Sequence, residues 1–393
     1  MNILKLTWEY PPRVVGGLAR HSEEISEALV HSWEKVDVIT ADHPGTPKYA
    51  QVNGVDIHRV KDFQFEAPDF FSWVLHFNFG IIRTAMELME TQQIDIIHAH
   101  DWLVAHAAIT LKHMYNKPLV ATIHATESGR WNGIHNKIQN YVHSMEWYLN
   151  YEAWRTIVCS HYMKDEVIGN YNLPASKIDI IPNGIKRDKF LFPFPDAMDF
   201  RRRLAMDHEP LIVSVGRMVP EKGFQILIDA AAEVLREVPH ARFVIAGKGG
   251  MLEELRYRAQ ALGIADRVSL PGYVSDEDLL KLLRVADVAA YPSLYEPFGI
   301  VALEAMAAHT PVVVSDTGGL GGIVEHGVTG MKTYKGSPDS LAWGIKQVLF
   351  HPDWAKWMVD QAYQRLIDTF NWDIIAEQTK QVYQRVSQEF NQG

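Results

Sequence analysis

The sequence predicts an α/β protein with two Rossmann-like domains, each built on a doubly wound parallel sheet. Short apolar strands alternate with amphipathic helices along the whole chain, which is the pattern of parallel sheets covered by helices on both faces. The chain has 393 residues, more than a single hydrophobic core normally serves, so two domains are expected. Its hydrophobic content of 47% is sufficient for two buried sheets.

The expected strands are short runs rich in isoleucine, valine and leucine, and the clearest helices between them cover residues 18–31 and 78–91. The first-domain strands cover residues 3–7, 36–40, 56–60, 94–98, 119–124, 157–160 and 178–181. The second-domain strands cover residues 211–216, 242–246, 268–270, 288–291 and 311–315. The segment Phe190-Leu-Phe-Pro-Phe-Pro195 interrupts this pattern, so the first domain is expected at residues 1–185 and the second at 196–371.

Composition limits the cellular compartments and the kinds of binding partner that we expect. The single cysteine, Cys159, excludes an internal disulfide, and its apolar strand makes it an expected core residue. The net charge is −10, and the first half holds more Asp and Glu than Lys and Arg, which disfavours nucleic acids and anionic membranes as partners. The first residues are too few and too soon charged for a signal peptide, and no apolar run approaches the roughly 20 residues that span a bilayer. We therefore expect a soluble, cytoplasmic protein.

Two carboxylates flank a predicted helix start in Glu296-Pro-Phe-Gly-Ile-Val-Ala-Leu-Glu304. The bare amides at a helix start attract anions, and Gly299 allows a ligand to approach the backbone closely. Glu296 and Glu304 could hold the neutral hydroxyls of a sugar and a ribose through hydrogen bonds. The motif fits a nucleotide sugar, and it also fits a simple helix entry flanked by surface acids.

Two cations follow the first predicted strand of the second domain, in Gly216-Arg-Met-Val-Pro-Glu-Lys-Gly223. Arg217 and Lys222 lie just past the carboxyl end of a parallel strand, which is where open α/β sheets bind ligands. The planar fork of Arg and the mobile charge of Lys suit a diphosphate. A solvated surface pair is the alternative.

The first domain offers polar positions at the ends of its own predicted strands. Gly16 and Gly17 open the first predicted helix, so their amides could approach a phosphate or sugar, or simply form a tight turn. Asp101 is expected either to accept a hydrogen bond from a substrate or to cap a helix. The neighbouring His98 and His100 share one strand face while Asp101 points away, so a metal site there would need distant ligands.

Taken together and in order, these motifs resemble those of the retaining glycosyltransferases of family four, whose relatives include the glycogen and starch synthases. The segment Thr317-Gly-Gly-Leu320 belongs to the same set, and the resemblance extends over essentially the whole chain. It implies the GT-B architecture, in which two Rossmann-like domains face each other across a cleft. It also implies that the last helix, at about residues 372–393, returns to the first domain.

For the second domain, the resemblance implies that Glu304 holds the ribose hydroxyls and Glu296 the 3- and 4-hydroxyls of the donor sugar. Negative charge builds on the diphosphate as the glycosidic bond breaks, and preorganised cations and amides stabilise it. The groups expected to do so are Arg217, Lys222 and the amides near Phe298, Gly299 and Gly319. Gly247 follows a predicted strand where a base or ribose could rest, and Tyr273 falls where relatives line the base pocket.

For the first domain, the resemblance implies that His124 bonds the 6-hydroxyl of the donor sugar and that Asp101 belongs to the sugar pocket. The loop with Gly16 and Gly17 is expected beside the diphosphate and the acceptor. The segment that follows His124, through Arg130-Trp-Asn-Gly-Ile-His135, is the candidate acceptor loop because it mixes aromatic, amide and cationic side chains.

The expected reaction is retaining transfer of a sugar from a nucleoside diphosphate donor, without a metal ion or an organic cofactor. The acids Asp276-Glu-Asp278 follow Ser275 at a predicted helix start, so they are interpreted as capping residues and not as metal ligands. Glucose from ADP- or UDP-glucose onto an α-glucan is the leading expectation. A small glycoside, a sugar phosphate or a lipid acceptor stays open, as do the more remote alternatives of a nucleotide-sugar epimerase and a noncatalytic sugar-binding protein. The oligomeric state is not predicted.

Overall fold

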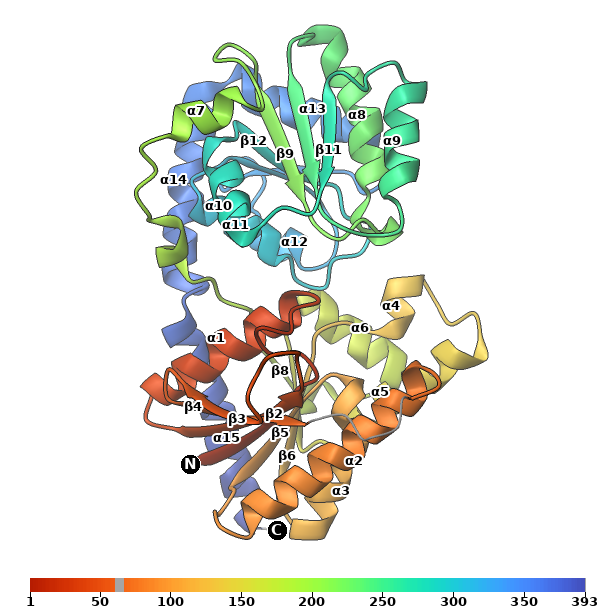
Figure 1. Ribbon diagram of the computed structural model, residues 1–393, viewed down its shortest axis with the longest axis vertical. Coiled ribbons are helices and arrows are strands. Elements are labelled where there is room, and N and C mark those ends of the chain that lie inside the picture. The colour runs from red at the N-terminus through yellow and green to blue at the C-terminus, as the bar shows by residue number, and fades with distance from the viewer. Residues whose placement is uncertain (61–66, 393) are drawn as a thin grey trace. The chain divides into compact units, whose positions relative to one another are not determined.

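The computed structural model describes residues 1–60 and 67–392, which form two compact units (Figure 1). The first unit comprises Met1–Gly184 and Trp372–Gly393, and the second comprises Ile185–Asn371. Each unit contains one sheet with helices on both faces. The C-terminal helix is therefore part of the first unit, although it follows the second unit in the chain.

The first unit holds an eight-stranded sheet. Its strands are β1 (Asn2–Leu6), β2 (Lys35–Ala41), β3 (Tyr49–Val52), β4 (Val55–Val60), β5 (Ile96–His100), β6 (Leu119–Ile123), β7 (Arg155–Val158) and β8 (Ile178–Ile180). They lie in the order β3-β4-β2-β1-β5-β6-β7-β8, and all neighbours are parallel except β3 and β4. The unpredicted edge strand β3 exists because Asn53 and Gly54, both with positive φ, make a tight hairpin turn into β4.

Helices cover both faces of the first sheet. They are α1 (Gly17–His31), α2 (Phe70–Met89), η1 (Trp102–Val104), α3 (Ala105–Tyr115), α4 (Glu127–Trp131), α5 (Lys137–Glu152), α6 (His161–Tyr171), η2 (Ala175–Lys177) and α15 (Trp372–Gln392). Helices α1 and α15 pack together on one face, where Ile25, Leu29, Ile375 and Val382 share a core with the sheet. Helices α2, α3 and α5 form a second packed layer.

The second unit holds a six-stranded, fully parallel sheet in the order β11-β10-β9-β12-β13-β14. The strands are β9 (Leu211–Val215), β10 (Arg242–Ala246), β11 (Val268–Gly272), β12 (Val288–Tyr291), β13 (Val312–Ser315) and β14 (Met331–Thr333). The helices are η3 (Arg187–Phe190), α7 (Ala197–Arg202), η4 (Pro220–Lys222), α8 (Phe224–Glu237), α9 (Leu252–Ala261), α10 (Asp276–Val285), α11 (Ile300–Ala307), α12 (Leu320–Ile323), α13 (Pro338–Phe350) and α14 (Pro352–Thr369). Side chains of α8, α9 and α13 share one core with the strands.

Each sheet reverses its strand order once, beside the first strand of its unit. In the first unit the reversal falls between β1 and β5, and in the second it falls between β9 and β12. Loops that leave the two strands at such a point diverge to opposite faces and open a crevice, which is the usual ligand site of this kind of sheet. The loops after β1, β5, β9 and β12 are therefore the first places to look for a site.

The structure settles several local predictions. Strand β5 ends at His100, two residues later than expected, and α2 begins at Phe70, eight residues earlier than expected. The interpretation of Asp276–Asp278 as capping residues is confirmed, because the Ser275 hydroxyl accepts the Asp278 amide at 3.1 Å where α10 begins. Cys159 is buried, as predicted. Among the described helices, none has the length and apolar character needed to cross a membrane.

Candidate functional site

In the second unit, the reversal of strand order between β9 and β12 brings Lys222 and Glu296 together. Lys222 ends the short η4 turn that follows β9, and Glu296 lies in the loop that follows β12. The Lys222 Nζ donates to Glu296 Oε2 at 2.6 Å, and the Ser293 hydroxyl donates to the same oxygen at 3.2 Å. Both charged side chains are largely shielded, with 18% and 10% of their side-chain surface exposed. A shielded ion pair at this point places one cation and one carboxylate where a ligand would bind.

The Thr317–Leu320 motif lies directly against the Glu296–Gly299 motif. The Gly319 amide donates to the Glu296 carbonyl at 2.8 Å, and a Cβ on Gly318 would lie only 1.9 Å from that carbonyl oxygen. A Cβ on Gly319 would lie 2.4 Å from the Phe298 Cα. The glycines are therefore required so that the two loops can pack backbone to backbone, which fixes Glu296 in place.

Helix α11 starts directly after the Glu296–Gly299 motif. Gly299 has φ +114°, a conformation that glycine tolerates, and it turns the chain into the helix without a side-chain cap at this end. Glu304 lies one turn further on and is buried. The amides that open α11 and the two carboxylates thus belong to one structural element.

Three other predicted second-domain residues lie on neighbouring loops and are more exposed. Arg217 directly follows the loop glycine after β9 and pairs loosely with Glu221 at 3.5 Å, with 54% of its side chain exposed. Gly247, with φ +152°, is needed because a Cβ there would lie 1.8 Å from the Gly216 carbonyl oxygen. Tyr273 is exposed and carries the Lys248 ammonium 4.1 Å above its ring. The structure explains Gly247 by loop packing alone, independently of any ligand.

In the first unit, the loop between β1 and α1 is held by an internal carboxylate. Glu9 is buried, and its Oε2 accepts the amides of Val15 at 2.8 Å and Gly16 at 2.9 Å. Burial raises the pKa of Glu9, although the two amide hydrogen bonds act in the opposite direction. The amide of Gly16 therefore already has an acceptor in this structure, while Gly17 is the first residue of α1.

Asp101 and His124 directly follow the neighbouring strands β5 and β6. Asp101 follows β5 and has φ +59°, an uncommon conformation for a residue with a side chain, and its Oδ1 accepts the His124 amide at 2.8 Å. Burial raises the pKa of Asp101 to about 6. The carboxylate thus positions the backbone of His124. This contact differs from both predicted roles of Asp101, which were a hydrogen bond to a substrate and a helix cap.

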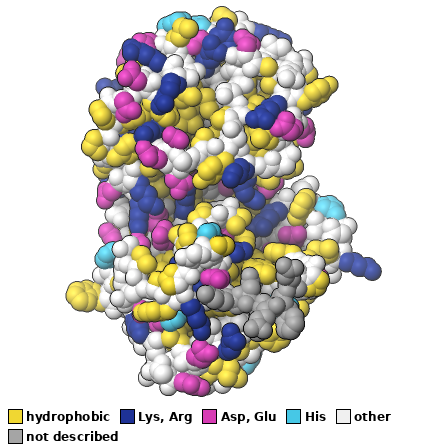
Figure 2. Space-filling view, in the orientation of Figure 1, with side chains coloured by type: hydrophobic (Ala, Val, Ile, Leu, Met, Phe, Trp, Pro, Cys, Tyr) yellow, Lys and Arg dark blue, Asp and Glu magenta, His cyan; other side chains and the backbone are white. Residues whose placement is uncertain are grey.

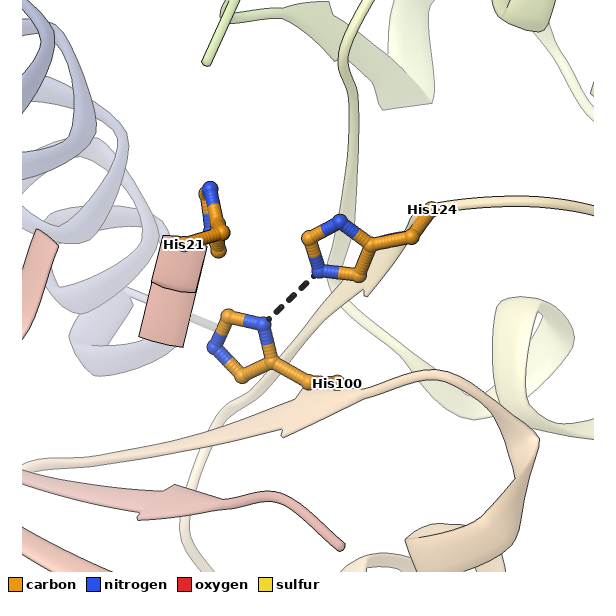
Figure 3. Close-up of side chains that lie close together, drawn as sticks. All are labelled: His21, His100 and His124. Atoms are coloured by element: carbon orange, nitrogen blue, oxygen red, sulfur yellow. Dashed lines mark hydrogen bonds between the residues drawn. The ribbon is translucent and has the colours of Figure 1, made fainter. Parts of the chain in front are cut away.

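The His124 ring belongs to a cluster with His21 and His100 (Figure 3). His100 Nδ1 and His124 Nε2 are hydrogen-bonded at 3.1 Å, and the ring of His21 on α1 lies 4.6 Å from that of His124. Burial lowers the pKa of His124 to about 3, and the charges of Lys5 and Arg130 act in the same direction. Burial also lowers the pKa of His21 and His100, so all three rings are neutral near pH 7.

These three residues are the part of the site that could hold a metal ion. One nitrogen from each lies within 4.8 Å of the others, and His21 supplies the distant ligand that the strand pattern lacked. Two of these rings are already hydrogen-bonded to each other, through His100 Nδ1 and His124 Nε2 at 3.1 Å. We therefore assign the cluster to the hydrogen-bonded support of His124.

The candidate acceptor loop is tied down by a buried carboxyl group on α5. Glu146 accepts the Glu127 amide through Oε1 at 2.9 Å and the Tyr171 hydroxyl through Oε2 at 2.6 Å. It thereby joins the start of α4 to α5 and α6. Burial raises the pKa of Glu146 to about 8.

Glu146→Gln is expected to raise the melting temperature of the first unit at pH 8 by at least about 3 °C, the effect of ~1 kcal/mol in a domain of this size. The unfolded chain releases this proton near the ordinary pKa of 4.5, whereas the folded chain holds it to about 8. Stability therefore falls as the pH rises through this window, and the neutral amide removes that fall. Calorimetry from pH 5 to 8 measures it.

Glu152→Gln is the matched control on the same helix, because Glu152 is paired with Lys112 at 2.6 Å and its pKa is lowered. This variant should gain no stability at pH 8. An unchanged pH slope in Glu146→Gln would contradict the account.

Sequence patterns missed several residues that shape the site. Glu9 and His21 lie inside a loop and a helix whose patterns carry no sign of burial, and Lys5 is a cation within an apolar strand. Tyr383 lies on the last helix and is hydrogen-bonded to His98 at 2.6 Å, a contact between residues far apart in the sequence. Of these residues, only Glu9 had a sign in the sequence, because it is an acid 7 residues before Gly16 of the glycine loop.

The chain is similar to known glycosyltransferases in sequence and in structure. Residues 15–189 match the family model described as "Glycosyltransferase Family 4", and residues 196–365 match "Glycosyl transferases group 1". An uncharacterized glycosyltransferase of Methanocaldococcus jannaschii is 39% identical over 98% of each chain. A glycogen synthase of Mycobacterium tuberculosis is 36% identical over 98% of this chain and 94% of its own. The structure of a sucrose-phosphate synthase from Thermosynechococcus elongatus superimposes with a TM-score of 0.84 at 25% identity, covering 98% of both chains.

Proposed function

The chain belongs to the glycosyltransferases of family 4, with two Rossmann-like domains of the GT-B fold, and we propose that it transfers glucose from ADP- or UDP-glucose to an α-glucan with retention of configuration. The GT-B prediction is confirmed by the two parallel-sheet units and by their structural neighbours. The sugar and the acceptor are the part that we propose.

The observation that carries the proposal is the Lys222–Glu296 pair at the crevice of the second sheet. The Lys222 ammonium can move from the carboxylate to the diphosphate of a donor, and Arg217 can approach from the same loop. Glu296 is then free to accept hydrogen bonds from sugar hydroxyls. When Lys222 moves to the diphosphate of the arriving donor, its charge and the Glu296 carboxylate that binds the sugar hydroxyls lie next to each other.

Charge on the leaving diphosphate would be met by protein groups alone. Lys222, Arg217 and the amides that open α11 are preorganised at one crevice, and such groups commonly lower a barrier by several kcal/mol. We propose on this basis that the reaction needs neither a metal ion nor an organic cofactor. Glu304, one turn into α11, would hold the ribose of the donor.

In the first unit, we propose that His124 donates a hydrogen bond to the donor sugar. Its ring is neutral, and its backbone is held by Asp101, so its position is fixed without adding a charge beside the sugar. The loop after His124 would receive the acceptor, anchored by Glu146. Attack by the acceptor hydroxyl on the face from which the diphosphate departs would retain the configuration.

An α-glucan acceptor is supported by the relative named glycogen synthase, which matches over nearly the full length of both chains. A sugar phosphate is the second candidate, supported by the structural likeness to a sucrose-phosphate synthase.

The mixed distribution of acidic and basic side chains on the face drawn in Figure 2 differs from the continuous basic surface typical of nucleic-acid binding.

Release of nucleoside diphosphate tests the proposal. ADP-glucose, UDP-glucose, GDP-mannose and UDP-N-acetylglucosamine are each incubated with glycogen, with maltoheptaose, with fructose 6-phosphate and without acceptor, in the presence and absence of EDTA. We expect glucan to stimulate release from one glucose donor, without an effect of EDTA. Stimulation by the sugar phosphate alone would favour the second candidate, and no release from any donor would refute the proposal.

A further inference from the structure

A group of aromatic side chains gathers at the crevice of the first sheet. Trp8 follows β1 and Trp102 follows β5, so one comes from each side of the point where the strand order reverses. The first turn of α2 adds Phe70, Phe71 and Trp73 between them, and α5 adds Tyr141. We call these six residues the aromatic platform.

The rings of the platform are in continuous contact. The Trp8 ring lies 6.4 Å from that of Trp73, which is stacked on Phe70 at 6.0 Å. Phe70 in turn lies 6.4 Å from Trp102. Phe71 stacks on Trp102 at 6.2 Å and meets the edge of Tyr141 at 5.5 Å. These distances are those of favourable ring pairs, so the platform is one packed surface and not a set of scattered side chains.

Part of this surface is open. Phe70 is 51% exposed and Tyr141 is 37% exposed, whereas Trp102 beneath them is 9% exposed. Exposure alone does not mark a binding surface, since Phe79 on the same helix is 63% exposed; Phe70 is distinguished by its ring contacts with Trp73 and Trp102. Clustered open aromatic rings at a ligand crevice indicate a binding surface.

The platform adjoins the proposed sugar site through the chain. Trp102 directly follows Asp101, whose carboxylate holds the backbone of His124. The residue that positions His124 and one ring of the platform are thus neighbours in the chain after β5.

The charges at the platform favour an uncharged occupant. The Arg13 guanidinium lies 5.3 Å from the Trp73 ring centre and 5.7 Å from that of Trp8, so its charge is engaged by aromatic faces. Asp69 lies next to Phe70 and caps α2, and this hydrogen bonding lowers its pKa and keeps it ionised. An ionised carboxylate beside the most open ring disfavours both an anionic lipid surface and a phosphate.

We propose that the aromatic platform binds the chain of an uncharged oligosaccharide acceptor, beyond the sugar unit that receives the transferred glucose. Each sugar ring presents an apolar C–H face to an aromatic ring while its hydroxyls stay in water, which suits amphipathic rings such as Trp and Tyr. The platform would make long acceptors better than short ones. This inference rests on the proposed function, and it names the acceptor class of the same site.

Phe70→Ala and Tyr141→Ala test the inference, with Phe79→Ala as the matched control because Phe79 is 63% exposed on the same helix and outside the platform. Each platform variant is expected to raise the KM for maltoheptaose and glycogen about threefold to tenfold. The KM for maltose and the acceptor-free hydrolysis of the donor should stay within twofold of wild type. Mobility in native gels containing glycogen measures the same loss without turnover.

Platform variants that match Phe79→Ala on long acceptors would overturn the inference, and so would an equal rise of KM for maltose and maltoheptaose. Transfer by the wild type to a sugar phosphate but not to glucan would overturn it while keeping the transferase. Platform variants that lose binding to anionic phosphatidylglycerol vesicles but still bind glycogen would also overturn the inference. Cleavage of no donor by the wild type refutes the proposed function itself, and glycogen mobility would still report on the platform.

Discussion

Lys222→Ala is expected to lower the turnover number about 10²- to 10³-fold while the protein stays folded. In the proposed reaction Lys222 supplies a positive charge where the diphosphate departs, and the loss of one such group typically has an effect of this size. Glu296 keeps its hydrogen bond from Ser293 in the variant, so the loop after β12 should hold its shape. Steady-state kinetics at saturating donor, together with circular dichroism, measures both parts of the expectation.

Lys281→Ala is the matched control. Lys281 also lies in the second unit, is paired with Glu277 at 2.6 Å and has 21% of its side chain exposed, against 18% for Lys222. Its loss should leave turnover unchanged. A folded Lys222→Ala protein that turns over within threefold of wild type would contradict the phosphate role.

Glu296→Gln is expected to lower turnover about 10²-fold without weakening the binding of free nucleoside diphosphate. In the proposed reaction the carboxylate accepts charge-assisted hydrogen bonds from two sugar hydroxyls, each worth about 1.5–3 kcal/mol, and the amide would replace them with weaker bonds. Free nucleoside diphosphate has no sugar hydroxyl to lose. Isothermal titration with ADP and UDP, set beside the kinetics, separates the two effects.

Lys222→Ala and Glu296→Gln should therefore differ in a defined way. The lysine variant should bind free nucleoside diphosphate more weakly, and the glutamine variant should bind it as wild type does. Glu277→Gln, which removes the partner of Lys281, serves as the control with wild-type kinetics. Equal loss of nucleotide affinity in both site variants would contradict the separate roles.

Much of the fold could be predicted because its signals are local. The strands of both sheets are short apolar runs whose order along the chain fixes the doubly wound pattern, and Ser275 marks the start of α10 through an ordinary cap. The start of α2 was missed, since Phe70, Phe71 and Trp73 show aromatic density without a clear helical period. Strands β3 and β14 were also missed, because Tyr49–Val52 is short and exposed and Met331–Thr333 has only three residues.

The candidate site was predictable where a motif carries its own chemistry. Lys222 and Glu296 are 74 residues apart, yet both follow parallel strands, and the strand order brings them to 2.6 Å. The contacts of His21 could not be foreseen, because they depend on how α1 lies against the sheet. The platform has the same origin, since Trp8 and Trp102 meet α2 only through the packing of three elements.

The configuration of the transferred sugar tests the central claim most directly. The enzyme is incubated with the α-linked glucose donor that it cleaves and with maltoheptaose, and the product is followed by proton NMR. We predict a new α-linked glucose at the end of the acceptor and one nucleoside diphosphate for each bond formed. A β-linked product, an epimerised nucleotide sugar or release of free glucose alone would contradict it.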